Sequence, residues 1–297
     1  MSHAALIVNS GSRSGSGLAD EAALELQDLG VQLGLALDVE GAKIREEVEE
    51  AVQQGLSPII VGGGDGTQSL AAEVLKNTGI PMGILPLGTG NALARDLGIP
   101  VDLRGACLTI ASGIPVDVDL GEANGKVFVN LCSLGLTVGI EEALNPEIKH
   151  TIGRAAYVSA VATALRQRSE FELTVSHQGA TSRVVTLLAG CGPGNTQGGV
   201  LPLPGQTSHQ SGELSFYAVD SLDLVKYAEL LWRLRHGTDE AMMELLSIQA
   251  GEITLTAEPC QIAIIDGEPA TETPVTLRCL PGALRVLVPR PPDGAGS

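Results

Sequence analysis

The sequence is poor in aromatic side chains and in positive charge. Phe, Tyr and Trp make up only 2% of the 297 residues although 44% are hydrophobic, so aliphatic side chains must fill the cores. The 18 Lys and Arg residues stand against 35 Asp and Glu, which gives a formal net charge of −17. We therefore expect no nucleic-acid partner, and any contact with an anionic membrane must be local.

Long apolar runs and paired cysteines are also lacking. No run approaches the roughly 18 apolar residues that span a bilayer, and residues 1–5 do not resemble a signal peptide. The five cysteines are odd in number and contain no C-x-x-C pair, which excludes a disulfide framework and a thiolate metal site. We expect a cytoplasmic protein, at most transiently associated with membranes, with reduced and mostly buried cysteines.

A glycine-rich loop at residues 61–67, Val-Gly-Gly-Gly-Asp-Gly-Thr, is the most informative segment that is present. It follows an apolar strand at 58–61 and precedes helical apolar spacing at 68–77. Glycines let backbone N–H groups approach phosphate oxygens, and the helix N-terminus would face the anion. The spacing fits neither a Walker loop nor G-x-G-x-x-G, and a plain strand-to-helix turn is the alternative.

Asp65 is the unusual member of this loop. A carboxylate beside a triphosphate is repelled unless Mg²⁺ or a transferable proton lies between them. Asp65 therefore favours phosphoryl chemistry over passive binding, with the carboxylate holding Mg²⁺ directly or through water.

A second glycine loop, Pro-Leu-Gly-Thr-Gly-Asn at 86–91, follows a predicted strand at 80–85 and precedes a predicted helix at 92–97. Two strand–loop–helix units about twenty residues apart place both loops at neighbouring strand ends, where open α/β sheets bind ligands.

The pattern of elements predicts two domains. Residues 1–117 alternate strand and helix, which indicates a doubly wound parallel α/β nucleotide-binding domain; the remaining elements are strands at 4–8 and 31–37 and helices at 18–29 and 42–54. Residues 118–290 are predicted to form a mainly antiparallel, sandwich-like β domain, with turns at Asn124-Gly125 and 177–179. Its later strands are expected at 252–257, 261–265, 275–279 and 284–288, and its helices at 151–168 and 222–235. Residues 291–297 are expected to be a disordered tail.

Together, the two glycine loops resemble those of the diacylglycerol kinase catalytic-domain family, which includes sphingosine kinases and soluble bacterial lipid kinases. Further matches in order cover nearly the whole chain: Leu-Ile-Val-Asn at 6–9, Val-Asp-Leu-Gly at 118–121, Gly-Arg-Ala-Ala-Tyr at 153–157 and Asp-Gly-Glu at 266–268. The resemblance implies a lipid kinase of lipid metabolism that uses ATP and Mg²⁺ to phosphorylate a lipid hydroxyl, most simply that of a diacylglycerol.

The resemblance also implies a set of ATP contacts: Asn9, Ser12, Arg13, Gly63, Gly64, Asp65, Gly66, Thr67, Thr89 and Asn91. A flexible loop at 10–17 and a helix cap at Asn91 are the structural alternatives.

Three further acids are candidates for the cleft. Glu268 follows the end of an apolar strand, and the resemblance makes it the proton acceptor, whereas the residues alone also allow an ordinary Asp-Gly hairpin turn. Asp266 either lies in the cleft or caps that turn. Asp119 lies at the predicted domain junction, in the cleft or in a structural role.

The chain departs from the family pattern at three places. Ser69-Leu70 replace a common Asn-Glu pair, and 209–214 lacks the acids of a second, structural Mg²⁺ site, so that ion is not predicted. Glu40 stands where a threonine often meets the nucleotide, and we leave it out of the site. A kinase of NAD type and a non-catalytic nucleotide- or lipid-binding regulator stay open as alternatives. The sequence does not decide whether the protein is a homodimer, nor whether helix 222–235 lies on a bilayer or in a core.

Overall fold

The computed structural model describes residues 3–9, 11, 17–135, 170–194, 196–197, 201–202, 208–220 and 245–291. The chain divides into two compact units, the first comprising residues 1–120 and 281–297 and the second residues 121–280. It passes from one unit to the other within strand β5 (Ile114–Ala123) and returns within β17 (Val275–Val288).

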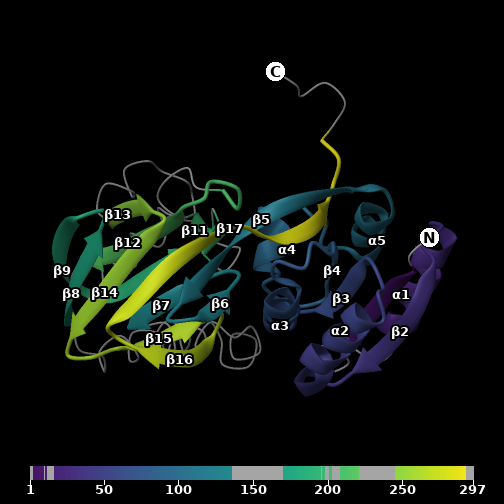
Figure 1. Cartoon of the computed structure of the whole chain (residues 1–297), viewed down its shortest axis with the longest axis horizontal. Helices are drawn as coiled ribbons and strands as arrows, with labels where there is room; N and C mark the ends of the chain where they lie inside the picture. The colour runs from purple at the N-terminus through teal and green to yellow at the C-terminus, as the bar shows by residue number, and fades with distance from the viewer. Residues whose placement is uncertain are drawn as a thin grey trace, which may run out of the picture. The chain divides into compact units, whose positions relative to one another are not determined.

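The first unit is a doubly wound α/β sheet (Figure 1), as predicted. Four parallel strands lie in the order β4-β3-β1-β2, and the end of β17 pairs in parallel with β4. These strands are β1 (Ala4–Asn9), β2 (Leu33–Val39), β3 (Ile59–Gly63) and β4 (Met82–Pro86). The chain proceeds from β1 to β2 on one side and from β3 to β4 on the other. The strand order therefore reverses between β1 and β3, which is where such sheets place their ligands.

The helices of this unit are amphipathic and cover both faces of the sheet. They are α1 (Leu18–Asp28), α2 (Ile44–Gln53), α3 (Asp65–Leu75), α4 (Ala92–Asp96) and α5 (Leu103–Ser112), with a short 3-10 turn, η1 (Gly41–Lys43), before α2. Helix α1 packs beside α5, and α2 beside α3. In α2 the buried side chains Ile44, Val48 and Ala51 recur at intervals of three and four residues, which puts them on one face.

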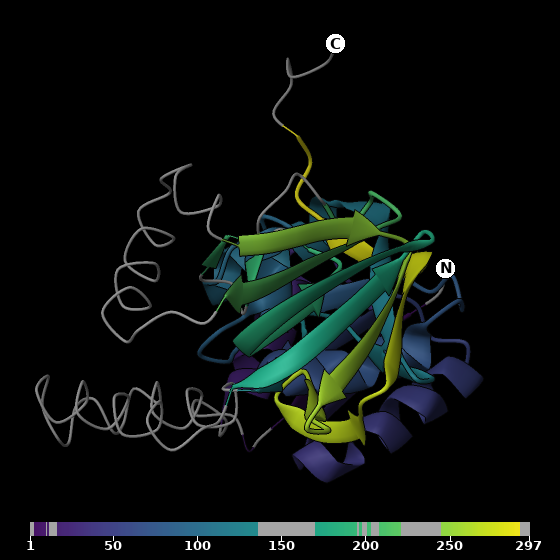
Figure 2. The ribbon, with the colours of Figure 1, turned by 90° about the vertical axis from the view of Figure 1, so that its left-hand side faces the viewer.

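The second unit is built from antiparallel strands (Figure 2), again as predicted. Its strands are β6 (Lys126–Phe128), β7 (Cys132–Gly135), β8 (Phe171–His177), β9 (Ala180–Gly192), β10 (Thr196–Gln197), β11 (Leu201–Pro202), β12 (Leu214–Asp220), β13 (Leu245–Ala250), β14 (Glu252–Glu258), β15 (Ile262–Ile265) and β16 (Glu268–Glu272). The long strand β9 pairs with β8 in its first half and with β7 in its second half. Thr186 lies at the junction, where its hydroxyl donates to the Leu188 carbonyl at 2.8 Å and accepts from the Leu188 N–H at 3.1 Å.

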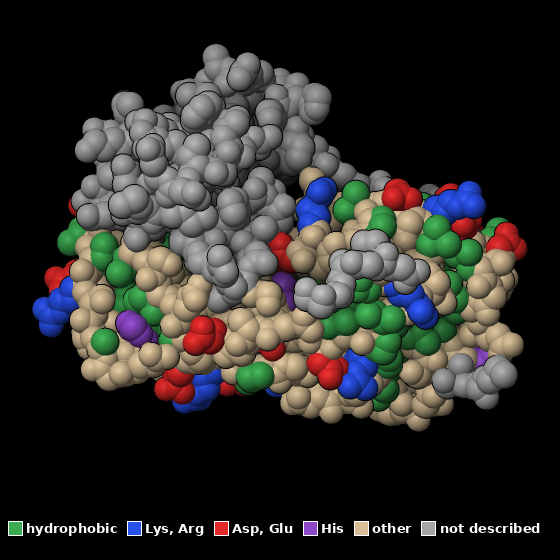
Figure 3. Space-filling view, turned by 90° about the horizontal axis from the view of Figure 1, so that it is seen from above, with side chains coloured by type: hydrophobic (Ala, Val, Ile, Leu, Met, Phe, Trp, Pro, Cys, Tyr) green, Lys and Arg blue, Asp and Glu red, His purple; other side chains and the backbone are tan. Residues whose placement is uncertain are grey.

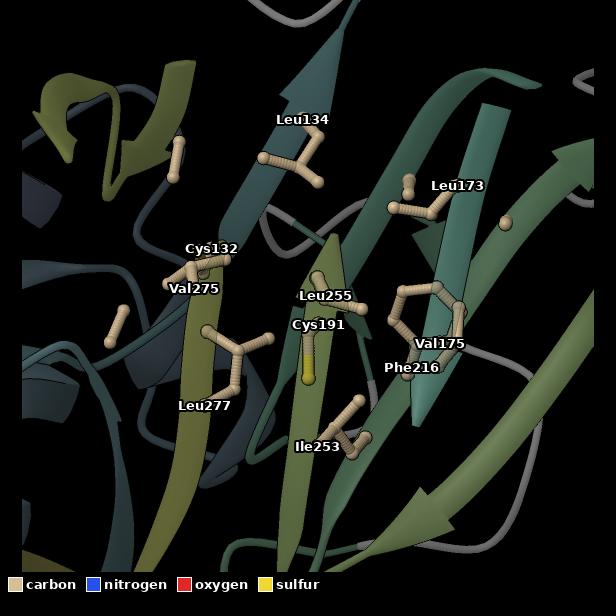
Figure 4. Close-up of a cluster of buried hydrophobic side chains, with 14 of the residues drawn as sticks. Cys132, Leu134, Leu173, Val175, Cys191, Phe216, Ile253, Leu255, Val275 and Leu277 are labelled. Atoms are coloured by element: carbon tan, nitrogen blue, oxygen red, sulfur yellow. The ribbon is translucent and has the colours of Figure 1, made fainter. Parts of the chain in front are cut away.

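The core of the second unit holds all the phenylalanines of the protein. Phe128, Phe171 and Phe216 are fully buried there among aliphatic residues. Figure 4 shows Phe216 among Leu173, Val175 and Ile253. Cys132 on β7 and Cys191 on β9 lie opposite each other in the strand register, in the same core. Burial raises the pKa of the Cys132 thiol to about 12, so the thiol stays protonated. All five cysteines are free. Three of them are buried, as expected, whereas Cys279 is partly buried and Cys260 is exposed.

Ion pairs on the surface join neighbouring elements. On the face in Figure 3, Lys and Arg side chains lie in small groups among Asp and Glu. Arg285 donates to both carboxylate oxygens of Asp117, at 2.7 and 3.0 Å, and this hydrogen bonding lowers the pKa of Asp117. Because both side chains are well exposed, the pair contributes little to stability.

Strand β17 differs from the prediction. The sequence indicates two strands, at 275–279 and 284–288, because Pro281 and Gly282 lie between them, but one strand runs through. Gly282 has a φ of 59°, and its N–H donates to the Asp119 carboxylate at 2.8 Å, so the irregular residue is held in place. From Pro281 onward the chain belongs to the first unit, whereas the sequence placed residues up to 290 in the second domain.

Other predicted elements fall outside the described residues. These are the helices at 151–168 and 222–235 and positions 292–297 of the expected tail. Within the part of the chain that the structure describes, no helix is long and apolar enough to cross a membrane.

Candidate active site

Three strand ends of the first unit come together at the carboxyl edge of its sheet. The side-chain amide of Asn9, at the end of β1, donates to the Thr67 hydroxyl at 2.8 Å. After β3 and β4, the Leu87 N–H donates to the Gly63 carbonyl at 3.0 Å. The two glycine loops and Asn9 are therefore neighbours, at the point where the strand order reverses.

The glycines of these loops serve two different purposes. A Cβ on Gly63 would lie 2.6 Å from that of Thr67, and a Cβ on Gly88 would lie 2.4 Å from the Cα of Gly64. Both positions need glycine because the protein itself fills the space. Gly66 is different, since it lies in the first turn of α3 and a Cβ there would meet nothing within 4 Å. The fold does not require glycine at position 66, so the open space beside it is available to a ligand.

The N-terminus of α3 faces this space without a capping side chain. Its N-cap residue is Gly64, which has no side chain to accept the first amide hydrogens of the helix. Those N–H groups have no partner within the helix and carry the positive end of its dipole. Such a terminus favours an anion.

Asp65 bridges the two loops. One carboxylate oxygen, Oδ2, accepts the Asn91 N–H at 2.9 Å, and the other, Oδ1, accepts the Ala92 N–H at 2.6 Å. These amides begin α4, so the carboxylate caps that helix. The sequence predicted a Mg²⁺ ligand at this position and did not predict the hydrogen bonds to the second loop.

The described residues do not form a metal site of their own, because they contain no group of three or more His, Cys, Asp and Glu side chains that could hold an ion. Mg²⁺ that arrives with nucleotide phosphates needs only one or two protein carboxylates, directly or through water.

Asn91 closes the second loop on itself. Its backbone is left-handed, with a φ of 51°, and its side chain accepts the Gly88 N–H at 3.0 Å and donates to the Gly88 carbonyl at 2.8 Å. Thr89, at the tip, is exposed. Arg95, which the sequence analysis did not single out, donates from Nε to the Gly90 carbonyl at 2.9 Å. The position of Arg95 in the sequence, about one helical turn after the second loop, could have indicated this contact. Ser12 and Arg13 lie outside the described residues.

Asp266, in the second unit, holds a neighbouring loop. Its carboxylate accepts three backbone N–H groups, those of Val129 at 2.9 Å, Asn130 at 2.9 Å and Leu131 at 3.0 Å. Asp266 and Gly267 both have positive φ, 46° and 92°, and form the two-residue turn between β15 and β16. The role of Asp266 therefore extends beyond the turn that the sequence suggested.

Glu268 follows this turn as the first residue of β16. Its side chain is exposed, and it has no hydrogen-bond partner within the described ranges. It is available to an incoming group, in contrast to Asp266. Asp119 is 3% exposed and accepts the Gly282 N–H, so at least one of its carboxylate oxygens has a structural role in the first unit.

Two family models match this chain, one over most of the first unit and the other mainly over the second unit. The model of the diacylglycerol kinase catalytic domain matches residues 3–123, and that of the YegS C-terminal NAD kinase beta sandwich-like domain matches residues 131–288. A diacylglycerol kinase from Mycobacterium tuberculosis is 29% identical over 93% of this chain and 93% of its own length. A Pseudomonas aeruginosa relative named "Probable lipid kinase YegS-like" is 30% identical over 96% of this chain and 94% of its own length.

A third relative is longer. An uncharacterized protein from Synechocystis sp., sll0036, is 31% identical over 83% of this chain, which spans 58% of that relative's length. Among solved structures, a diacylglycerol kinase from Bacillus anthracis str. Sterne shares the fold with a TM-score of 0.74, at 21% identity over 96% of each chain. A second structure from that organism has a TM-score of 0.80 at 23% identity, covering 96% of this chain and 97% of the other.

The chain therefore belongs to the diacylglycerol kinase catalytic domain family, and it is a phosphotransferase of this lipid-kinase-like class. The resemblance seen in the two glycine loops and in the late Asp-Gly-Glu is confirmed.

Proposed function

We propose that the protein transfers the γ-phosphate of MgATP to the hydroxyl group of a diacylglycerol-like lipid. The observation that carries the ATP part is Gly66, a glycine that neither the backbone nor the packing requires, beside a helix N-terminus with no capping side chain. Backbone N–H groups of 64–67 would bind phosphate oxygens, and Asn9 would support them through its bond to Thr67. Thr89 and Asn91 are proposed to border the nucleotide on the second loop.

Glu268 is the proposed general base. Its exposed carboxylate, unpaired within the described residues, and its place in the Asp-Gly-Glu sequence support this assignment. The lipid hydroxyl oxygen attacks the γ-phosphorus, the bond from that phosphorus to the β,γ-bridging oxygen breaks, and ADP leaves. The proton of the hydroxyl goes to Glu268. Mg²⁺, bound to the ATP phosphates, neutralises part of their charge and is part of the substrate.

Labelled ATP tests the proposal directly. The full chain is incubated with [γ-³²P]ATP and Mg²⁺, with diacylglycerol in detergent micelles in one arm and NAD in another. We expect label in the lipid extract of the first arm, dependent on Mg²⁺, and none in the nucleotide of the second. Label in NADP would instead show an NAD kinase. ATP binding without transfer to either acceptor would contradict the proposal and favour a regulator.

A size series at Gly66 tests the ATP site independently of the lipid. Gly66→Ala should weaken ATP binding at least tenfold, about 1.4 kcal/mol, because its methyl group occupies the space proposed for phosphate. Gly66→Val should weaken binding further. The melting temperature of the alanine variant should stay the same or rise, since alanine stabilises a helix by up to about 1 kcal/mol relative to glycine. Calorimetric titration measures the affinity for ATP. Unchanged affinity in both folded variants would show that the nucleotide phosphates do not bind beside Gly66.

A further inference from the structure

Asp65 presents a problem of charge, because a carboxylate next to a phosphate-binding loop repels the ligand. The contacts of the first unit solve it without a metal. Both carboxylate oxygens accept N–H groups at the start of α4, where the helix dipole is positive. The negative charge of Asp65 is thus directed at α4, while the uncapped N-terminus of α3 stays available.

We infer that Asp65 is a positioning residue, which fixes the second glycine loop against the first, and that it is not a direct ligand of the metal in MgATP. This inference rests on the proposed function and refines it. It replaces the interpretation that places Mg²⁺ directly on Asp65.

The packing around Asp65 shows why the loop depends on it. Gly88 lies so close to Gly64 that a Cβ could not fit between them, and the Leu87 N–H donates to the Gly63 carbonyl. The bonds from Asn91 to Gly88 close the loop internally but do not join it to the first loop. At its far end the second loop is joined to the first through the Asp65 carboxylate. Loss of that carboxylate would therefore release the 89–92 end.

Three variants test the inference in the full chain. Asp65→Asn removes the charge and one acceptor. Asp65→Glu keeps a carboxylate able to bind a metal but displaces its oxygens from the two amides. Asp102→Asn is the matched control, because Asp102 caps α5 through a bond to the Gly105 N–H at 2.8 Å, in another part of the sequence.

Two measurements separate positioning from metal binding. Hydrogen exchange of the Asn91 and Ala92 amides, without any substrate, should be at least tenfold faster in both Asp65 variants and unchanged in Asp102→Asn. In both Asp65 variants, the Mg²⁺ concentration that half-saturates activity at fixed ATP should change less than twofold. The KM of these two variants for ATP should rise at least tenfold.

A tenfold rise in the Mg²⁺ requirement of Asp65→Asn, with normal exchange and with Asp65→Glu close to wild type, would overturn the inference. If either variant does not fold, the other still decides the exchange result. Should the wild type phosphorylate no lipid, calorimetric ATP binding with and without Mg²⁺ replaces the activity measurement. The failure of the proposed function then shows in the lipid assay, and failure of the inference shows in the exchange rates.

Discussion

Glu268→Gln lowers kcat by about 10²- to 10⁴-fold and leaves the affinity for ATP unchanged, if Glu268 is the base that receives the lipid hydroxyl proton. Glutamine is nearly the same size and cannot accept that proton. Glu268 is exposed at the start of β16 and its side chain has no hydrogen-bond partner among the described residues, so the substitution should not lower stability.

The control for this prediction lies on the same strand. Glu272→Gln makes the same change in charge at another exposed position of β16 and should keep kcat within about twofold. Calorimetry supplies the ATP affinity of both variants. A Glu268→Gln variant that retains most of its kcat would exclude the base, and one that loses ATP binding in parallel would make Glu268 a ligand of the nucleotide.

Asp266→Ala should give a large loss of stability. The substitution leaves three N–H groups, of Val129, Asn130 and Leu131, without the carboxylate that accepts them. Each unsatisfied buried donor costs about 1 to 3 kcal/mol, and these are only partly buried, so we expect a loss of about 3 to 5 kcal/mol. At roughly 2 to 4 °C per kcal/mol, the melting temperature should fall by about 10 °C.

Asp266→Ala removes the hydrogen-bond acceptor and also puts alanine in a left-handed backbone conformation, and Asp266→Asn separates these two effects. Asparagine tolerates the left-handed backbone, which has a φ of 46°, and keeps one acceptor oxygen, so it should be less damaging than alanine. Calorimetric melting of both variants beside Glu272→Gln provides the comparison. Equal melting temperatures for Asp266→Ala and the wild type would show that the three hydrogen bonds do not stabilise the second unit. Because Glu268 follows the same turn, we expect kcat to fall with stability.

The general architecture was predictable because local patterns determine it. Alternating strand and helix periods indicated the parallel sheet, and the Asn124-Gly125 turn, whose two residues have φ of 48° and 86°, indicated a hairpin. Strand β16 was missed because it contains Pro269 and three polar residues. It lies at the end of the strand order, and an edge strand tolerates proline.

The functions of the acids were harder to predict, for a physical reason. Asp65, Asp119 and Asp266 all accept backbone N–H groups from segments far away in the sequence, at separations of 26 to 163 residues. Every residue except proline carries the same N–H group, so the sequence contains no sign of which amides will meet a given carboxylate. The sequence singled out these three acids as candidates but did not indicate their hydrogen-bond partners.

Strand β17 has a consequence for the synthesis of the protein. The first unit emerges from the ribosome first, yet its sheet is completed by residues after Pro281, because Val286 pairs with Met82 on β4. Residues 121–280 are translated in between, which takes roughly 10 to 30 s at typical rates. During that interval β4 has an unpaired edge, which other chains can bind. Translation that stops within this interval would yield a chain that carries both glycine loops but has an incomplete parallel sheet in its first unit.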